Sequence, residues 1–185
     1  MKKKVNILGI SGSLRKGSYN TSALKAAVDL VSKDARIMIF NLGDLPFFNK
    51  DLERNLPASI RAFKETIEKS DALFFVTPEY NYSISGVLKN AIEWGSRPSG
   101  ENSWEGKPAA IMGASSGPRG TARAQLHLRQ IFVDLGIIAV VETEVLIGNA
   151  AQKFDKDGNL IDDDTKERIR KLLVALVNVT RKLSS

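Results

Sequence analysis

The sequence has no cysteine and a single histidine among its 185 residues. Without cysteine the protein cannot form disulfides, thiolate metal sites or iron–sulfur clusters, and it cannot use a thiol for redox chemistry. Any redox reaction must therefore be carried by a bound cofactor. The histidine, His127, lies in a predicted helix between Arg123 and Arg129 without metal-ligating partners. We therefore expect it to be a helix-surface or interface residue, and we expect no metal site.

Long hydrophobic runs are also missing. No apolar stretch approaches the roughly 20 residues that a membrane span needs, and the N-terminal apolar run is too short for a signal peptide. We therefore expect a cytoplasmic protein with no membrane partner. The net charge is +6. Because the basic residues form no helix with interleaved aromatic side chains, we expect no nucleic-acid partner either.

The sequence does contain an alternation of apolar strands and helical patterns. Several strands are continuous apolar runs, which is typical of a parallel sheet covered on both faces. The expected strands are residues 5–10, 36–40, 72–76, 109–113 and 137–141, and the expected helices are residues 21–32, 58–69, 87–95, 121–135 and 164–183. The length suits one core, so the pattern predicts a single domain over residues 1–185, a doubly wound α/β sandwich.

The loop after the first strand, S-G-S-L-R-K-G-S-Y-N-T, is rich in hydroxyl groups and leads into a helix. The free N–H groups and the dipole of a helix N-terminus attract anions. The candidate phosphate ligands are Ser11, Ser13, Arg15, Ser18, Asn20 and Thr21. The spacing of glycines and lysines fits neither a Walker loop nor a dinucleotide fingerprint, so a monophosphate suits the loop best. An ordinary turn is the alternative for this loop taken alone.

Two more loops of small or polar residues follow later strands. They are P-E-Y-N-Y-S after the third strand and S-S-G-P-R-G-T after the fourth. Because the carboxyl ends of parallel strands meet at one edge of the sheet, all three loops are expected to converge on one site.

Together these motifs resemble the NADPH-dependent FMN reductase family, a flavodoxin-like group that includes bacterial quinone, chromate and azo-dye reductases. The matching segments are G-S-L-R-x-G-S-x-N at 12–20, P-E-Y-N at 78–81, S-G-V-L-K-N-A-I-E-W at 85–94 and S-S-G-P-R-G at 115–120. The resemblance covers nearly the whole chain. It implies a flavodoxin-like three-layer sandwich with a five-stranded parallel sheet in the order 2-1-3-4-5.

The same resemblance implies where a cofactor binds. The first loop would hold the phosphate of FMN, and the isoalloxazine ring would lie along Pro78, Glu79, Tyr80 and Asn81, with Ser115 and Gly117 near its pyrimidine edge. Each of the two candidate substrate-binding residues has two possible roles. Tyr82 could stack on a nicotinamide or quinone or pack across a subunit contact, and Arg119 could meet the 2′-phosphate of NADPH or pair with an acidic neighbour.

The implied activity needs no catalytic side chain. Hydride would pass from NADPH or NADH to bound FMN and then to a small acceptor, such as a quinone, flavin, azo dye or chromate, with the two substrates alternating at one face. The resemblance also implies a homodimer or homotetramer in which the helix at 87–95 forms much of the contact. The alternatives are a flavodoxin-type electron carrier, which the charge of +6 disfavours, and a flavin-free phosphate-binding module.

Two further features are expected to be structural. The segment D-K-D-G-N at 155–159 has its glycine at the wrong position for a calcium loop and predicts a tight turn ending a short hairpin. Trp94 is predicted to belong to the helix core.

Overall fold

The computed structural model describes residues 3–184. Its single sheet is parallel, with strands in the order β2-β1-β3-β4-β5 and a further strand, β6, paired with β4. The strands are β1 (Val5–Ser11), β2 (Ala35–Phe40), β3 (Ala72–Val76), β4 (Pro108–Ala114), β5 (Ile138–Ala139) and β6 (Val145–Ile147). The predicted order 2-1-3-4-5 is confirmed.

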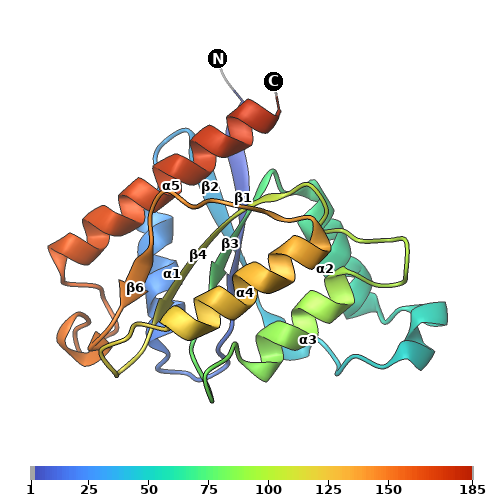
Figure 1. Ribbon diagram of the computed structural model, residues 1–185, viewed down its shortest axis with the longest axis horizontal. Helices are drawn as coiled ribbons and strands as arrows, with labels where there is room; N and C mark the ends of the chain where they lie inside the picture. Colours follow the sequence, from blue (N-terminus) through green and yellow to red (C-terminus); the bar gives the residue numbers. More distant parts are fainter. Residues whose placement is uncertain (1–2, 185) are drawn as a thin grey trace.

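Helices cover both faces of the sheet and make three layers (Figure 1). The helices are α1 (Tyr19–Leu30), α2 (Ala58–Lys69), α3 (Gly86–Gly95), α4 (Ala122–Leu135) and α5 (Asp163–Leu183). One core cluster joins α1 and α5 to the sheet, and a second joins α2, α3 and α4 to its other face. The predicted three-layer α/β sandwich is therefore confirmed.

The strand β3 shows why the sheet is buried on both sides. All five residues of A-L-F-F-V are buried. Successive side chains of a strand point to opposite faces, so Phe74 lies in the cluster under α1 and α5 whereas Leu73 and Phe75 lie in the other. Trp94, predicted as core, is fully buried in that second cluster, and its indole N–H donates to the Pro46 carbonyl at 2.8 Å.

The fifth strand differs from its prediction. Residues 137–141 were expected to form one strand, but only Ile138 and Ala139 pair, with Pro108 and Ala109. The chain then leaves the sheet and returns as β6, which pairs with Met112, Gly113 and Ala114 further along β4. Residues 142–144, Glu-Thr-Glu, are polar, and this break leaves Val141 exposed. Apolar character alone therefore did not determine where this edge strand pairs.

The helices were predicted to within two residues at each end, and α2 has the predicted bounds. Their capping residues explain the starts of three of them. The Ser18 side chain accepts two backbone N–H groups at the N-terminus of α1, and Ser85 and Asp162 accept one each at the N-termini of α3 and α5. Three short 3₁₀ helices, η1 (Leu42–Asp44), η2 (Lys50–Asn55) and η3 (Ala150–Gln152), were not predicted.

The segment 155–159 is a tight turn, as predicted. Phe154 and Leu160 form an antiparallel bridge across it, and the Asp155 carboxylate accepts the N–H groups of Asp157 and Asn159. The carboxylate therefore accepts hydrogen bonds from the backbone of its own turn. This is the arrangement of an Asx turn and differs from that of a calcium loop.

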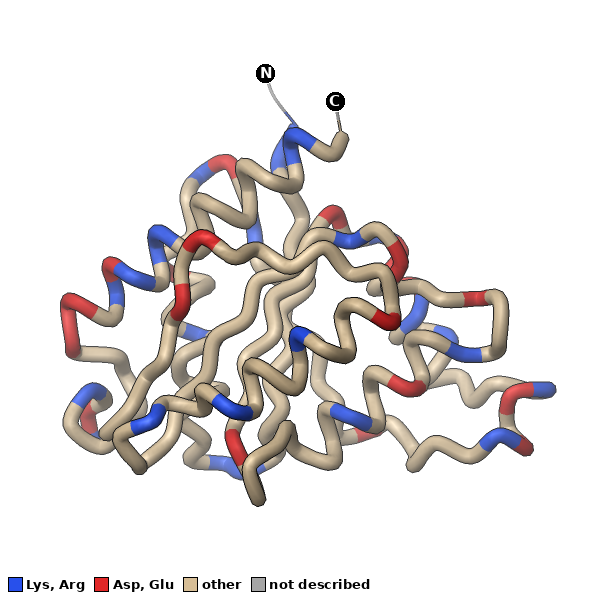
Figure 2. The backbone as a smooth tube through the Cα atoms, in the orientation of Figure 1, with Lys and Arg blue, Asp and Glu red and all other residues tan. Residues whose placement is uncertain are grey.

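Basic and acidic residues are mixed along the described chain. Figure 2 shows lysine and arginine side by side with aspartate and glutamate over the helices and loops. Within residues 3–184, none of the helices is both long enough and apolar enough to cross a bilayer. The two ends of the described chain, Lys3 and Ser184, lie at the same end of the molecule (Figure 1), where they line a common hollow with Val5 and Thr180.

Candidate active site

The three polar loops meet at the carboxyl edge of the sheet, as expected. They enclose a cavity of about 460 Å³ that takes residues from each of them. Its lining residues are Ser13, Arg15, Ser18, Tyr19 and Asn20 from the first loop, Pro78, Glu79 and Tyr80 from the second, and Ala114, Ser115 and Ser116 from the third. Sequence reasoning missed Tyr19, Ala114 and Ser116, although Tyr19 and Ser116 stand inside the motifs that it used.

The first loop ends at the N-terminus of α1. The hydroxyl of Ser18 accepts the N–H groups of Asn20 and Thr21 at 3.2 and 3.4 Å. The hydroxyl of Thr21 lies 3.0 Å from that of Ser11. These hydroxyls are therefore already hydrogen-bonded at the base of the loop. The Ser13 hydroxyl accepts the Arg15 N–H at 3.4 Å, and Arg15 is exposed.

Asn20 links the first loop to the strand that leads into the third. Its side-chain amide donates to the Ala114 carbonyl at 2.9 Å, and its side-chain oxygen accepts the Ala114 N–H at 2.8 Å. Asn20 is only 4% exposed. Both polar groups of this side chain are thus used to brace the cavity from beneath.

Gly12 lets the first and second loops approach each other. A Cβ atom at this position would lie 3.1 Å from both Pro78 Cδ and Ser85 Oγ. The Ser85 hydroxyl donates to the Gly12 carbonyl at 2.6 Å. A side chain at this position would therefore crowd both neighbours.

The second loop folds back on itself in a tight turn. Tyr80 and Ser83 exchange two backbone hydrogen bonds of 3.0 Å, and the residues between them, Asn81 and Tyr82, have φ of 48° and 69°. Two central residues with positive φ are the mark of a type I′ turn. Tyr82 is largely exposed on this turn and lies outside the cavity lining.

The side chain of Glu79 is held by α4. Its carboxylate accepts the N–H groups of Arg123 and Ala124 and pairs with the Arg123 guanidinium. Burial alone would raise the pKa of the Glu79 carboxyl, but together these partners lower it below its usual value. Glu79 is therefore ionised near neutral pH and is unsuited to act as a general acid.

The third loop is supported by the segment after β6. The Ser115 hydroxyl donates to the Gly117 carbonyl at 3.0 Å, which also accepts the Asn149 N–H at 3.0 Å. Arg119, beyond them, is exposed and outside the cavity lining. The structure therefore brings Ser115 to the cavity and leaves Arg119 at the protein surface.

His127 lies on the exposed face of α4, as predicted, with its Nδ1 3.1 Å from the Ser83 hydroxyl. Among the described residues, no group of three or more metal-ligating side chains is placed to hold an ion.

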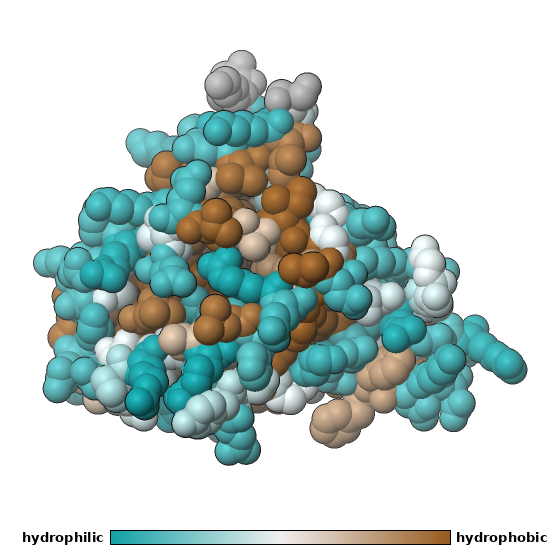
Figure 3. Space-filling model, in the orientation of Figure 1, coloured by the Kyte–Doolittle hydropathy of each residue, from teal (hydrophilic) through white to brown (hydrophobic). Residues whose placement is uncertain are grey.

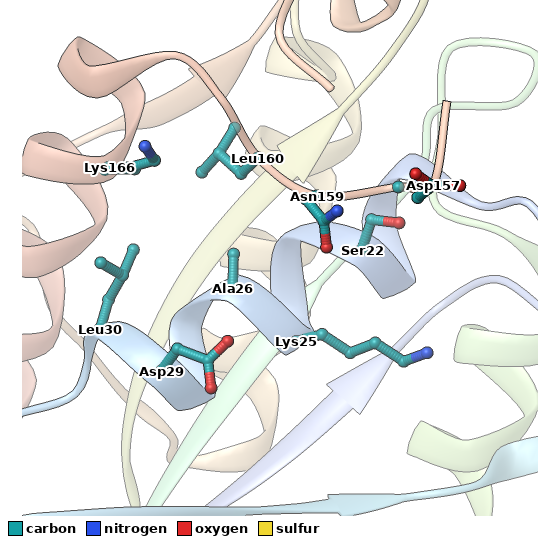
Figure 4. A pocket seen from close by; sticks show the side chains of 10 residues that line it. Ser22, Lys25, Ala26, Asp29, Leu30, Asp157, Asn159, Leu160 and Lys166 are labelled. Atoms are coloured by element: carbon teal, nitrogen blue, oxygen red, sulfur yellow. The ribbon is translucent and has the colours of Figure 1, made fainter. Parts of the chain in front are cut away.

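A separate hollow of about 300 Å³ lies between α1, the 155–159 turn and the start of α5 (Figure 4). Lys25 and Lys166 enter it together with Asp29 and Asp157. Its charges therefore balance, whereas Arg15 is the only charged residue that the first loop contributes to the lining of the other cavity.

Comparison with known proteins identifies the group. A sequence model of the NADPH-dependent FMN reductase family matches residues 5–152. The chain belongs to this family. An NAD(P)H-dependent FMN reductase of Pseudomonas aeruginosa is 48% identical over 184 residues, 99% of each chain. An NADPH:quinone oxidoreductase of Arabidopsis thaliana is 42% identical over 190 residues, covering 99% of this chain and 95% of that one.

A solved structure agrees with this FMN reductase assignment. FerB, a flavoenzyme NAD(P)H:(acceptor) oxidoreductase from Paracoccus denitrificans, superposes with a TM-score of 0.89 at 37% identity, covering 96% of this chain and 98% of that chain. The expected family, the enzyme class of NAD(P)H-dependent FMN or quinone reductase, and the expected FMN and NAD(P)H are thereby confirmed.

The residues of this FMN reductase fit the cofactor. A hydroxyl-rich helix N-terminus with one arginine suits a phosphate, and the cavity extends from it to two loops whose backbone can approach a flat ring. The one carboxylate in the lining, Glu79, is neutralised by Arg123, so that no unpaired negative charge opposes the phosphate.

Proposed function

We propose that this protein is an FMN-dependent NAD(P)H oxidoreductase that reduces a small acceptor, such as a quinone, free flavin, azo dye or chromate, with donor and acceptor binding in turn at the same face. Residues 1–185 would form one FMN-binding domain. The observation that carries the proposal is the meeting of three loops, far apart in sequence, around one cavity of about 460 Å³. When bound, FMN supplies the hydride-transfer chemistry.

The first loop would bind the phosphate. Arg15 would supply a guanidinium fork and Ser13 a hydroxyl, and the positive end of the α1 dipole would face the phosphate at the segment that Ser18 caps. Ser11, Asn20 and Thr21 would keep this loop in place through their hydrogen bonds to one another and to Ala114.

The second and third loops would hold the ring. Pro78, Tyr80 and Asn81 would lie along it, and Ser115 and Gly117 would offer backbone groups to its pyrimidine edge. No acid or base is needed, since the side chains here position the cofactor and exclude water.

Two exposed residues would contact the substrates. Tyr82 lies against Arg123 with its ring otherwise accessible, so it would stack on the nicotinamide or acceptor. Arg119 would meet the 2′-phosphate of NADPH. We expect the protein in the cytoplasm, the compartment that supplies NAD(P)H.

We also propose a homodimer or homotetramer. Figure 3 shows apolar side chains gathered on one face of the molecule, and the exposed apolar residues of α4 and of the segment between β5 and β6 include Val133 at 84% and Val141 at 74% exposure. A groove of about 680 Å³ separates α4 from α3, the helix predicted to form the contact. A second copy would cover such a face.

The test is anaerobic reduction of the FMN-loaded protein with NADPH and with NADH, followed by reoxidation with a panel of acceptors. Bleaching of the flavin band by either nicotinamide and its return with a quinone are expected. A protein that binds FMN but does not oxidise either nicotinamide would instead be an electron carrier. A protein that cannot be loaded with FMN would refute the proposal.

A further inference from the structure

The carboxylate of Glu79 joins two of the three loops. It lies in the second loop, with 9% of its side chain exposed. It accepts the N–H of Arg123 at 3.0 Å and that of Ala124 at 3.3 Å, the second and third residues of α4. The residue at the N-cap position, Thr121, makes no side-chain capping bond. Glu79 therefore caps, from another loop, the helix that begins directly after the third loop.

Arg123 completes this link. Its Nε and Nη2 atoms lie 2.7 and 2.5 Å from Glu79 Oε1, and its guanidinium lies 3.5 Å from the centre of the Tyr82 ring. A guanidinium that is paired on one side and stacked on the other has little freedom to move. We call Glu79, Arg123 and Tyr82 the loop clamp.

The backbone around the loop clamp is strained. Within residues 3–184, four residues other than glycine have positive φ, and three of them are Asn81 at 48°, Tyr82 at 69° and Thr121 at 70°. Thr121 is β-branched, so this conformation is especially unfavourable for it. A strained backbone persists only where the surrounding structure holds it in place. Strained residues are common at active sites and ligand-binding sites, whose geometry is set before the ligand binds.

We propose that Glu79 is a positioning residue for the flavin ring, which it holds through Arg123 and α4 by fixing the second loop against the third. This role rests on the proposed function, because it takes FMN to occupy the cavity. Arg123 is not among the residues that line the cavity. Removing it should therefore reproduce the effect of changing Glu79, which a direct contact between Glu79 and the ring would not explain.

The test compares Glu79→Gln, Arg123→Met and the double variant with Glu65→Gln, which removes the same charge from an exposed ion pair with Lys69. FMN and riboflavin are titrated by fluorescence, and the visible circular dichroism of the bound flavin is recorded. Each single variant should raise the Kd for both flavins by the same factor, about tenfold, and should change the dichroism. The double variant should bind about as well as either single one.

Three results would overturn this role. They are single variants that bind both flavins as the wild type does with unchanged dichroism, effects that add in the double variant, and an equal effect of Glu65→Gln. If Glu79→Gln does not fold, Arg123→Met decides by the same two measurements, because it leaves the backbone bonds to Glu79 in place. A wild-type protein that binds no flavin would refute the proposed function itself, and the role of Glu79 with it.

Discussion

At the scale of single residues, the side chains of the first loop differ in their contacts. Some bond to other parts of the protein, and others face the cavity proposed to hold the FMN phosphate. Asn20 uses both ends of its amide on Ala114, and Ser11 and Thr21 bond to each other. Arg15 has a guanidinium 5.8 Å from the centre of the Tyr19 ring and is otherwise exposed at the cavity. Replacing different residues of this one motif should therefore change different properties, either the affinity for the ligand or the stability of the protein.

Replacing Arg15 should weaken phosphate binding selectively. Arg15→Met would remove the proposed charge-assisted bonds to the phosphate, so we expect about a tenfold rise in the Kd for FMN with little change for riboflavin, which has no phosphate. Fluorescence titration with both flavins measures this. Lys16→Met, at the neighbouring exposed cation, is the matched control, and an equal loss there would show that only the overall charge matters.

Replacing Asn20 should instead lower stability. Asn20→Ala leaves the buried N–H and carbonyl of Ala114 without their partners, which costs about 2–4 kcal/mol in the free energy of unfolding. Urea unfolding of the flavin-free protein measures it. Asn41→Ala, which removes a capping bond at an exposed site, should cost about 1 kcal/mol or less. Equal losses in both variants would contradict the bracing role.

Sequence reasoning found the residues of this loop but not their partners. Ala114 lies 94 residues from Asn20, and Arg123 lies 44 residues from Glu79, so no local spacing signals either pair. Hydroxyl-rich loops after apolar strands were recognisable because the topology of a parallel sheet brings such loops together. Which of their side chains bond to one another depends on distances that only the folded chain has.

At the scale of elements, the loop clamp makes the start of α4 sensitive to acid. The pKa of Glu79 is lower in the folded protein than its usual 4.5. Its contribution to stability is therefore fully present above that value and is lost as pH falls through the lowered pKa. The stabilisation disappears because protonation ends the ion pair with Arg123.

Acid unfolding should therefore separate wild type from Glu79→Gln. We expect the wild type to be more stable near pH 7 and the difference to shrink below about pH 4.5. Urea unfolding of both flavin-free proteins at a series of pH values measures the gap. Glu65→Gln should differ little from the wild type throughout, because exposed ion pairs contribute little. A gap of constant size down to about pH 3 would contradict the assignment.

Helices were easier to predict than the edge of the sheet. The bounds of α2 follow from its amphipathic pattern between Pro57 and Ser70. The fifth position of the sheet was harder, because β5 and β6 are short edge strands and β4 alone decides where each of them pairs. An edge strand has one neighbour, so its apolar residues do not report its pairing.

At the scale of the whole molecule, the alternation of strands and helices predicted the layers and the edge at which the site lies, and the family resemblance implied the strand order. This pattern could not predict which helix exposes apolar side chains at the surface. α3, the expected subunit contact, exposes Gly86 and Lys89, whereas α4 exposes Leu126 and Val133. The apolar part of the proposed interface therefore lies next to the helix that the sequence indicated.

A charge on this face should disrupt assembly. Val133→Glu is expected to convert the FMN-loaded protein to a smaller species in sedimentation velocity at micromolar concentration, because a carboxylate would be buried without a partner. Met38→Glu, at an exposed apolar residue on the opposite edge strand β2, is the control and should sediment as the wild type does. A wild-type monomer would refute the proposed oligomer.

The shared position of the chain ends has a practical consequence. Lys3 and Ser184 line one hollow at the amino edge of the sheet, whereas the three loops leave the carboxyl edge. A short linker could therefore join the two ends, and new ends could be opened in an exposed loop. Circular permutants of this kind, or fusions that attach the protein to an electrode or a bead, would keep the proposed flavin cavity facing away from the attachment point.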